Sequence, residues 1–235
     1  VPNCRAYDPA YAYELAVIIH DGMKKMYVEQ QNIFYYLSVM NENYVQPPMP
    51  AGAEEGILKG AHQIREGIRG KLRATLLGSG TILREVLAAA EILENDYKIP
   101  ADVFSVTSFS ELRREALNVE RENLLNPGRP AQQPYVAKLF GARTQPIVAA
   151  TDNMRIVPDQ IRQWIPGRYV TLGTDGFGRS DGRAALRHHF EVDRRYVVLA
   201  ALKALADEGS IERAVVVDAV KKLGIDSSNA NPLNS

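Results

Sequence analysis

Apolar residues between Lys71 and Asp96 predict a buried strand followed by an amphipathic helix. Leu72 to Leu77 form a nearly continuous apolar run, and Gly78-Ser79-Gly80 forms a turn. Beyond the turn, apolar residues recur at helical spacing on one face, at Ile82, Leu83, Val86, Leu87, Ala90 and Leu93. Ser79 or Thr81 is expected to cap this helix. A strand that runs through a short loop into a helix is the unit of a parallel α/β sheet.

The same pattern recurs through the rest of the chain. Further strands are predicted at 103–106, 147–150 and 169–172, and helices from Ser108 to about Leu124, Pro158 to Ile165, Asp193 to about Ala206, and Ser210 to Gly224. Ser108 with Glu111 is a capping box, and Gly209 is expected to end the third of these helices. Alternating strands and helices predict a three-layer α/β domain with a mostly parallel sheet over residues 57–224.

The first 45 residues predict one helix and one strand, which is too little for a domain. Asp8-Pro9 is expected to begin a helix that reaches Tyr27, and Ile33 to Val39 to form a buried strand. Residues 41–56 lack apolar periodicity and contain three prolines, so we place a linker at 46–56. We expect 1–45 to be the last helix and strand of a second, incomplete α/β domain, and 225–235 to be a polar, frayed tail.

Composition narrows the function classes. Lys plus Arg and Asp plus Glu both number 28, so no net charge attracts nucleic acid or an anionic membrane. No apolar run approaches the ~20 residues that span a bilayer. The single cysteine, Cys4, favours a reducing, cytoplasmic setting.

Two glycine-rich stretches are candidates for ligand sites. Gly78-Ser79-Gly80 lacks the third glycine of a dinucleotide fingerprint, because position 83 is Leu, and a tight turn is favoured. The loop 173–180 (GTDGFGRS) could hold an anion through its free N–H groups and its arginine. A structured turn is favoured, in which Asp175 and Arg179 pair or cap backbone groups.

The adjacent pair His188-His189 does not predict a metal site. Neighbouring helical residues point about 100° apart, and a helix break is expected between His189 and Asp193. A surface or interface role is favoured. His20 and His62 are isolated, so the residues alone reveal no catalytic set.

Four segments together carry a resemblance to a known family. They are Asn41-Glu42-Asn43-Tyr44 (NENY), MPAGAEEGILKG (49–60), LGTDGFGRSD (172–181) and LRHHFEVD (186–193). They resemble the homodimeric bacterial pyruvate dehydrogenase decarboxylating component, a thiamine diphosphate-dependent enzyme, over essentially the whole chain. More loosely, the GTDGFGRS loop is similar to that of the transketolase C-terminal domain.

The resemblance implies that 1–45 ends a pyrimidine-binding-type middle domain and that 57–224 is a transketolase C-terminal-like domain. It implies an oxidoreductase that decarboxylates pyruvate and passes the acetyl group to lipoyl arms of a dihydrolipoyl acetyltransferase core. Thiamine diphosphate and Mg²⁺ are held in this family by a Gly-Asp-Gly…Asn motif in another domain. The motif does not occur here, so this chain is expected to be structural, to contribute to a homodimer, and to bind neither alone.

Asn41, Glu42, Asn43 and Tyr44 follow a predicted strand, and ligands gather at the carboxyl ends of parallel strands. By the resemblance, this strand end lies at a substrate channel, and an amide, a carboxylate and a phenol suit a substrate without phosphate. The alternative is a turn in which Asn and Glu cap the backbone.

Two other interpretations of the whole chain stay open. It can be a fragment of transketolase or of another 2-oxoacid dehydrogenase, or a free-standing interaction module. Independently of these alternatives, the loop residues Asp175, Phe177, Arg179 and Ser180 are candidates for a structural or interface role with the histidine pair.

Overall fold

The computed structural model describes residues 1–68, 70 and 72–234. Lys71, where the predicted strand–helix stretch begins, and Ser235, the end of the tail, lie outside the described residues.

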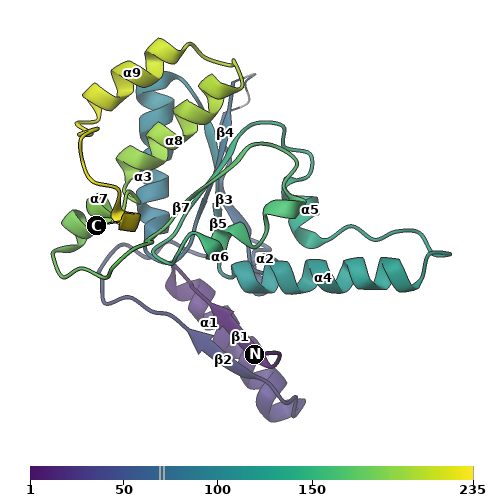
Figure 1. Cartoon of the computed structure of the whole chain (residues 1–235). Coiled ribbons are helices and arrows are strands. Elements are labelled where there is room, and N and C mark those ends of the chain that lie inside the picture. The colour runs from purple at the N-terminus through teal and green to yellow at the C-terminus, as the bar shows by residue number, and fades with distance from the viewer. Residues whose placement is uncertain (69, 71, 235) are drawn as a thin grey trace.

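A five-stranded sheet forms the centre of the molecule (Figure 1). Its strands are β3 (His62–Arg65), β4 (Ala74–Gly78), β5 (Ala101–Ser105), β6 (Ile147–Ala150) and β7 (Tyr169–Leu172), in the order β3-β5-β4-β6-β7. The last four are mutually parallel, as predicted, while β3 is an antiparallel edge strand. Its sequence, HQIR, is mostly polar, and the apolar pattern did not predict it.

Helices cover both faces of the sheet, which confirms the three-layer α/β prediction. On one face lie α3 (Ile82–Tyr97) and α8 (Arg194–Asp207), with α9 (Arg213–Lys222) packed on α8. On the other lie α4 (Phe109–Leu125), α5 (Tyr135–Phe140), α6 (Ile156–Asp159) and the 3₁₀ turn η2 (Arg162–Trp164). Helix α5 falls in a region where no element was predicted.

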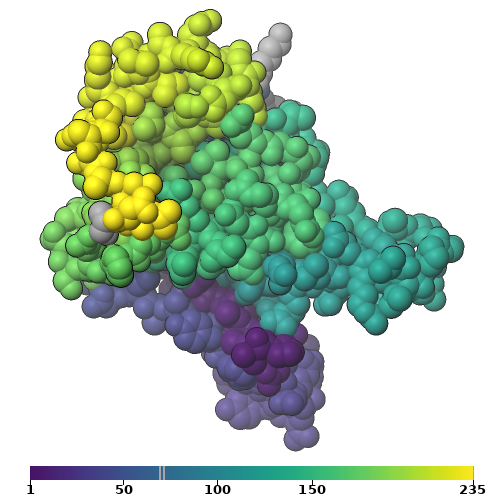
Figure 2. Space-filling model, in the orientation of Figure 1, coloured from purple at the N-terminus to yellow at the C-terminus, as the bar shows by residue number. Residues whose placement is uncertain are grey.

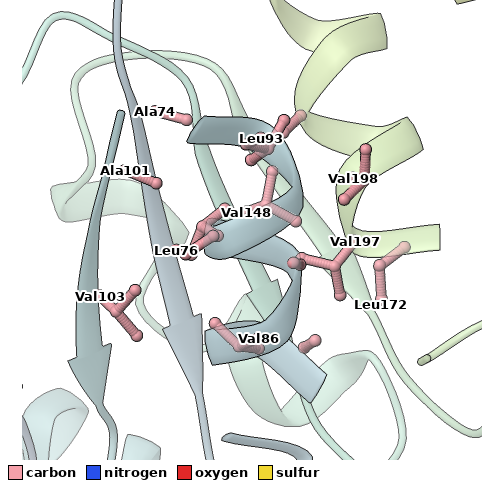
Figure 3. Close-up of a cluster of buried hydrophobic side chains, with 14 of the residues drawn as sticks. Ala74, Leu76, Val86, Leu93, Ala101, Val103, Val148, Leu172, Val197 and Val198 are labelled. Carbon is pink, nitrogen blue, oxygen red and sulfur yellow. The ribbon is translucent and has the colours of Figure 1, made fainter. Parts of the chain in front are cut away.

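Strand residues alternate between the two cores. Leu76 of β4 and Val148 of β6 point toward α3 and α8 (Figure 3), whereas Leu77 faces α4 and α5. All three are fully buried, and burying each such side chain is worth roughly 1.5–3 kcal/mol relative to exposure. A strand buried on both faces is therefore a continuous apolar run, which is why the pattern predicted it.

The first 59 residues form a smaller unit next to the sheet. It contains β1 (Cys4–Tyr7), α1 (Ala12–Met23), a π-helical turn η1 (Lys24–Val28), β2 (Phe34–Leu37) and α2 (Glu54–Lys59), and β1 pairs with β2 in parallel. Strand β1 was not predicted. Strand β2 is shorter than expected, and its residues alternate between exposed and half-buried instead of being buried. Helix α2 begins inside the predicted linker.

Several predicted helix ends differ in the structure. Helix α1 begins three residues after Pro9, with Tyr11 and not Asp8 at its N-cap. Neither Ser79 nor Thr81 caps α3 with its side chain. Ser108 does cap α4, since its Oγ accepts from the N–H of Glu111, and Gly209 has the expected left-handed backbone.

The C-terminal residues pack against the body (Figure 2, yellow). Pro232 is buried, and its carbonyl fills the space that a side chain at Gly176 would need. Pro232 is therefore packed and not frayed, whereas Asn231, Leu233 and Asn234 around it are exposed. No helix in the described ranges is long and apolar enough to span a membrane.

Candidate functional site at the carboxyl ends of the parallel strands

Strands β4 and β6 are parallel neighbours, but the connections that leave them lie on opposite faces of the sheet. After β4 the chain crosses one face of the sheet through α3, and after β6 it crosses the other face through α6. Such a switch point leaves a crevice beyond the strand ends, where open α/β sheets bind ligands. The two strand ends are joined here by a hydrogen bond of 2.8 Å from Ser79 Oγ to Thr151 Oγ1.

The smaller N-terminal unit lies at this edge of the sheet (Figure 1). Asp8 anchors it, because its N–H donates to the Thr107 carbonyl after β5 and its carbonyl accepts from Gly80 N–H after β4. The Asp8 carboxylate accepts from Ser38 and Asn153. Burial nevertheless raises its pKa. Asp8 thus joins the unit to the sheet instead of capping α1.

A second anchor is the buried carboxylate of Glu14. Its Oε1 accepts from His62 Nε2 at 2.7 Å and from Ser105 Oγ at 2.6 Å. Its Oε2 accepts from the N–H groups of Ala10 and Tyr11. His62 and Ser105 follow Glu14 by 48 and 91 positions in the sequence. The sequence therefore left His62 isolated and did not single out Glu14.

Two stretches that the sequence singled out separately meet at this edge. Glu42 forms ion pairs of 2.5 Å with Arg84 of α3 and with Arg187 of helix α7 (Arg183–His189). Asn41 Oδ1 accepts from Arg183 at 2.6 Å. The NENY segment is therefore held against α7, which contains the histidine pair.

The other two residues of the segment have different surroundings. The Tyr44 hydroxyl donates to the Ala10 carbonyl, and its ring lies 4.7 Å from the Arg84 guanidinium. Asn43 is exposed. Tyr44 thus contributes to the packing of the N-terminal unit.

Arginines determine the ionisation of the acidic groups here. The hydrogen bond from Arg187 holds the pKa of Glu42 below its ordinary value. Burial acts to raise the pKa of Glu85, but hydrogen bonds from Arg194 outweigh it and lower the pKa overall. Both carboxylates are therefore charged at neutral pH, and Arg187 lies between them, 3.5 Å from Glu85.

A cavity of about 340 Å³ lies between the NENY segment, α7 and the strand ends. Thr81, Asp152 and Thr174, which follow β4, β6 and β7, contribute to its wall. Met40 and Glu42 contribute from the N-terminal unit. The structure thus brings part of the predicted channel segment to a cavity at the switch point.

The histidine pair lines a second cavity, of about 580 Å³, on α7. His188 Nδ1 lies 3.5 Å from Asp193 Oδ2, and the His189 ring packs against Phe190. Helix α7 ends at His189 and α8 begins at Arg194, so the predicted helix break before Asp193 is confirmed.

The glycine-rich loop is a structured turn. Asp175 pairs with Arg155 and accepts its backbone N–H. Arg179 forms no hydrogen bond or ion pair within residues 1–68, 70 and 72–234, so the expected capping role holds only for Asp175. Ser180 lines the larger cavity, and Phe177 is 76% exposed.

The described residues do not fit a Mg²⁺–diphosphate group. They contain no cluster of three or more His, Cys, Asp or Glu side chains with metal-ligand geometry. The most buried carboxylates, Glu14 and Asp102, already accept from His62 and Ser105, and from Arg73 and Arg143.

Comparison with known proteins gives two family matches. The model described as "Transketolase-like TK C-terminal domain" matches residues 60–193, and the model described as "Pyruvate dehydrogenase E1 component middle domain" matches residues 1–47. The predicted boundaries at 45, 56 and 224 stay predictions.

Curated relatives are similar along the whole chain. A protein of Pseudomonas aeruginosa named "Pyruvate dehydrogenase E1 component" is 59% identical over 100% of this chain and 27% of its own length. The protein of the same name from Escherichia coli K12 is 53% identical over 99% of this chain and 26% of its own length. The chain therefore spans about a quarter of these relatives.

Among solved structures, transketolase from Campylobacter jejuni superposes with a TM-score of 0.59 at 15% identity, over 86% of this chain and 26% of that one. This likeness supports the fold.

Proposed function

The chain belongs to the transketolase-like TK C-terminal domain family, and we propose that it is the C-terminal part of a pyruvate dehydrogenase decarboxylating subunit. The observation that carries the proposal is the 59% identity to a pyruvate dehydrogenase E1 component along the entire chain. The match of residues 1–47 to the middle domain of that component supports it, because a transketolase fragment would not be expected to match there.

In this proposal the complete protein is an oxidoreductase. It decarboxylates pyruvate and passes the acetyl group to lipoyl arms of a dihydrolipoyl acetyltransferase core in a multienzyme complex. Thiamine diphosphate and Mg²⁺ are bound by parts of the complete protein outside this chain. The free Cys4 supports a cytoplasmic setting.

The role of this chain is structural. Glu14, Asp8 and Glu42 each join the N-terminal unit to the sheet domain through partners at the carboxyl edge of the sheet. Glu14 is buried, and a buried polar group must be hydrogen-bonded, so a shift between the two units would leave its carboxylate without partners. The chain thus fixes where the end of a middle domain lies relative to the C-terminal domain.

We also propose that the segment of Asn41, Glu42, Asn43 and Tyr44 forms part of the substrate-channel wall in the complete protein. Glu42 borders the cavity at the switch point, which supports the proposal. The arginine partners of Glu42 and Asn41 offer a different explanation, in which the segment only anchors α7.

Self-association is the second structural role that we propose. On the N-terminal unit, Phe34 and Tyr36 of β2 are 46% and 63% exposed, and Ile19 and Met23 of α1 are exposed one turn apart. Large exposed apolar surfaces mark interaction sites.

The loop residues Asp175, Phe177, Arg179 and Ser180, with His188 and His189, are proposed as interface residues of the homodimer. Sedimentation at tens of micromolar should detect association, and Phe34→Ser with Tyr36→Ser should reduce it. A monomer over that range would contradict this part.

A chimera tests the function directly. The matching C-terminal quarter of the Pseudomonas aeruginosa relative would be replaced by this chain, and release of CO₂ from pyruvate would be measured. We expect at least half of the parental rate, because the contacts that position the two domains lie within the exchanged segment.

The matched control carries the corresponding segment of the Campylobacter jejuni transketolase, which has the same fold at 15% identity. It should lose activity. A folded first chimera that does not act on pyruvate would overturn the proposal, and activity on a ketose phosphate would indicate a transketolase.

A further inference from the structure

Three arginines spaced four residues apart face the cavity at the switch point. They are Arg179 in the glycine-rich loop and Arg183 and Arg187 on α7, and all three line its wall. Residues four apart lie on the same face of a helix, so the two α7 side chains point in the same direction.

The three guanidinium groups differ in how far their charge is balanced. Arg187 is paired with Glu42 and Glu85. Arg183 binds the neutral side chain of Asn41, and its contact with Glu42 is long, at 3.9 Å. Arg179 has no ion pair or hydrogen bond with any residue that the structure describes. Two of the three positive charges therefore lack a close counter-ion.

The acidic groups of the cavity do not cancel this charge. The charge of Glu42 is balanced by its ion pairs with Arg84 and Arg187. Asp152, at the end of β6, has no arginine within ion-pair distance in the described part of the chain, and the three guanidinium groups of the wall outnumber its two carboxylates. The cavity mouth is thus positive.

Most of the remaining wall is apolar, with Thr81 and Thr174 as polar exceptions. The apolar part is formed by side chains from the N-terminal unit, α3, α7 and the turn before α8, namely Met40, Ile82, Leu186, Phe190 and Val192. At about 340 Å³ the cavity is at the small end of the roughly 300–1,000 Å³ that is usual for small-molecule sites. Apolar walls with a few convergent polar groups are the usual composition of such sites.

We propose that this cavity binds a small organic anion, a carboxylate or a phosphate monoester with an apolar body. The anionic group lies between Arg179 and Arg183, whose planar guanidinium groups can each donate two parallel hydrogen bonds. The apolar body lies against Ile82, Leu186 and Phe190.

Titration calorimetry of the purified protein with four probes tests the site. Phenyl phosphate and benzoate each have an anion and a ring, whereas inorganic phosphate has only the anion and benzyl alcohol only the ring. We expect one of the two complete probes to bind with a Kd below about 1 mM, and both partial probes to bind at least tenfold more weakly. Tighter binding of phenyl phosphate identifies a phosphate monoester, and tighter binding of benzoate identifies a carboxylate.

Two variants and a control locate the binding. Arg179→Gln should weaken the tightest probe about tenfold, because one charge-assisted interaction is lost. Gly178→Leu should abolish binding without removing a charge, since Gly178 lines the cavity and has open space where a side chain would begin. Arg121→Gln is the matched control, because Arg121 is exposed on α4 and does not line the cavity.

The proposal is overturned if no complete probe binds below about 10 mM, or if a partial probe binds within threefold of the best complete one. It is also overturned if Arg121→Gln weakens binding as much as Arg179→Gln, or if Gly178→Leu leaves binding unchanged. This cavity also borders the proposed substrate channel, but no assay uses pyruvate or thiamine diphosphate, so a failure of the anion site and a failure of the proposed function give different results.

Discussion

Replacing Glu14 with alanine should loosen the N-terminal unit from the sheet. The side chain is fully buried and accepts four hydrogen bonds, from His62, Ser105 and two backbone N–H groups. His62 and Ser105 can rearrange, but the N–H groups of Ala10 and Tyr11 cannot become acceptors. Two unsatisfied buried donors at about 1–3 kcal/mol each give a loss of about 4 kcal/mol.

That loss corresponds to a fall in Tm of about 12 °C, at about 3 °C per kcal/mol for a chain of this size. Glu14→Gln should cost less than half as much. Its amide oxygen can face the two backbone N–H groups, while its NH₂ group donates to Ser105 Oγ and to His62 Nε2 in the other neutral tautomer. Only charge assistance is lost.

Thermal unfolding and amide hydrogen exchange are the measurements. In Glu14→Ala, protection should fall in α1 and stay high in β4 and α3, because the core of the sheet is not touched. Glu55→Ala, at an exposed i,i+4 ion pair, should give no measurable change. Equal effects of Ala and Gln at position 14 would refute the reasoning, as would an alanine effect below about 1 kcal/mol.

Calorimetric titration of this chain with thiamine diphosphate and Mg²⁺ should show no saturable binding, because the described carboxylates form no metal-ligand cluster; micromolar binding would contradict this. In the complete protein, Asn41→Ala or Glu42→Ala should lower kcat/KM for pyruvate about 10-fold, equivalent to about 1.4 kcal/mol, with unchanged cofactor affinity. Normal kinetics with reduced thermal stability would instead assign the segment to anchoring α7. Asp152→Asn should raise the free energy of unfolding at neutral pH. Burial raises the folded-state pKa of Asp152, so the stability that its protonated form contributes is fully present below the ordinary pKa of 3.8 and is lost as pH rises through the raised pKa. The gain should vanish near pH 3 in chemical denaturation, and a pH-independent difference would argue against the sign.

The sequence predicted elements whose hydrophobic pattern is strong and local. Strands β6 and β7 match their predicted bounds, and α3 and α8 match closely, because β6 is buried on both faces and both helices have a continuous apolar stripe. Strand β3 was missed because an edge strand needs few apolar residues. Strand β1 was missed because its stability comes from pairing with β2, some 30 residues later.

The candidate site could be predicted only in part. The residues of the NENY segment and of α7 were recognised as unusual, but their contact joins positions 145 apart, as between Glu42 and Arg187. No local pattern encodes such a contact. Glu14 was overlooked for the same reason, since it appears in the sequence as one more acidic residue in the first turn of a helix.

The anchors of the N-terminal unit also have a consequence for folding during synthesis, because their partners lie later in the chain. Within this chain, the two-stranded sheet of this unit is held by contacts with the five-stranded sheet domain. Its partners, Gly80, Ser105 and Thr107, leave the ribosome after it. At about 5–20 residues per second, the roughly 50 residues between α2 and Thr107 take about 3–10 s to synthesise. For that interval the Glu14 carboxylate lacks Ser105, and the Asp8 backbone lacks Gly80 and Thr107. Variants that weaken the anchors should therefore reduce the yield of folded protein in cells more than their equilibrium stability indicates.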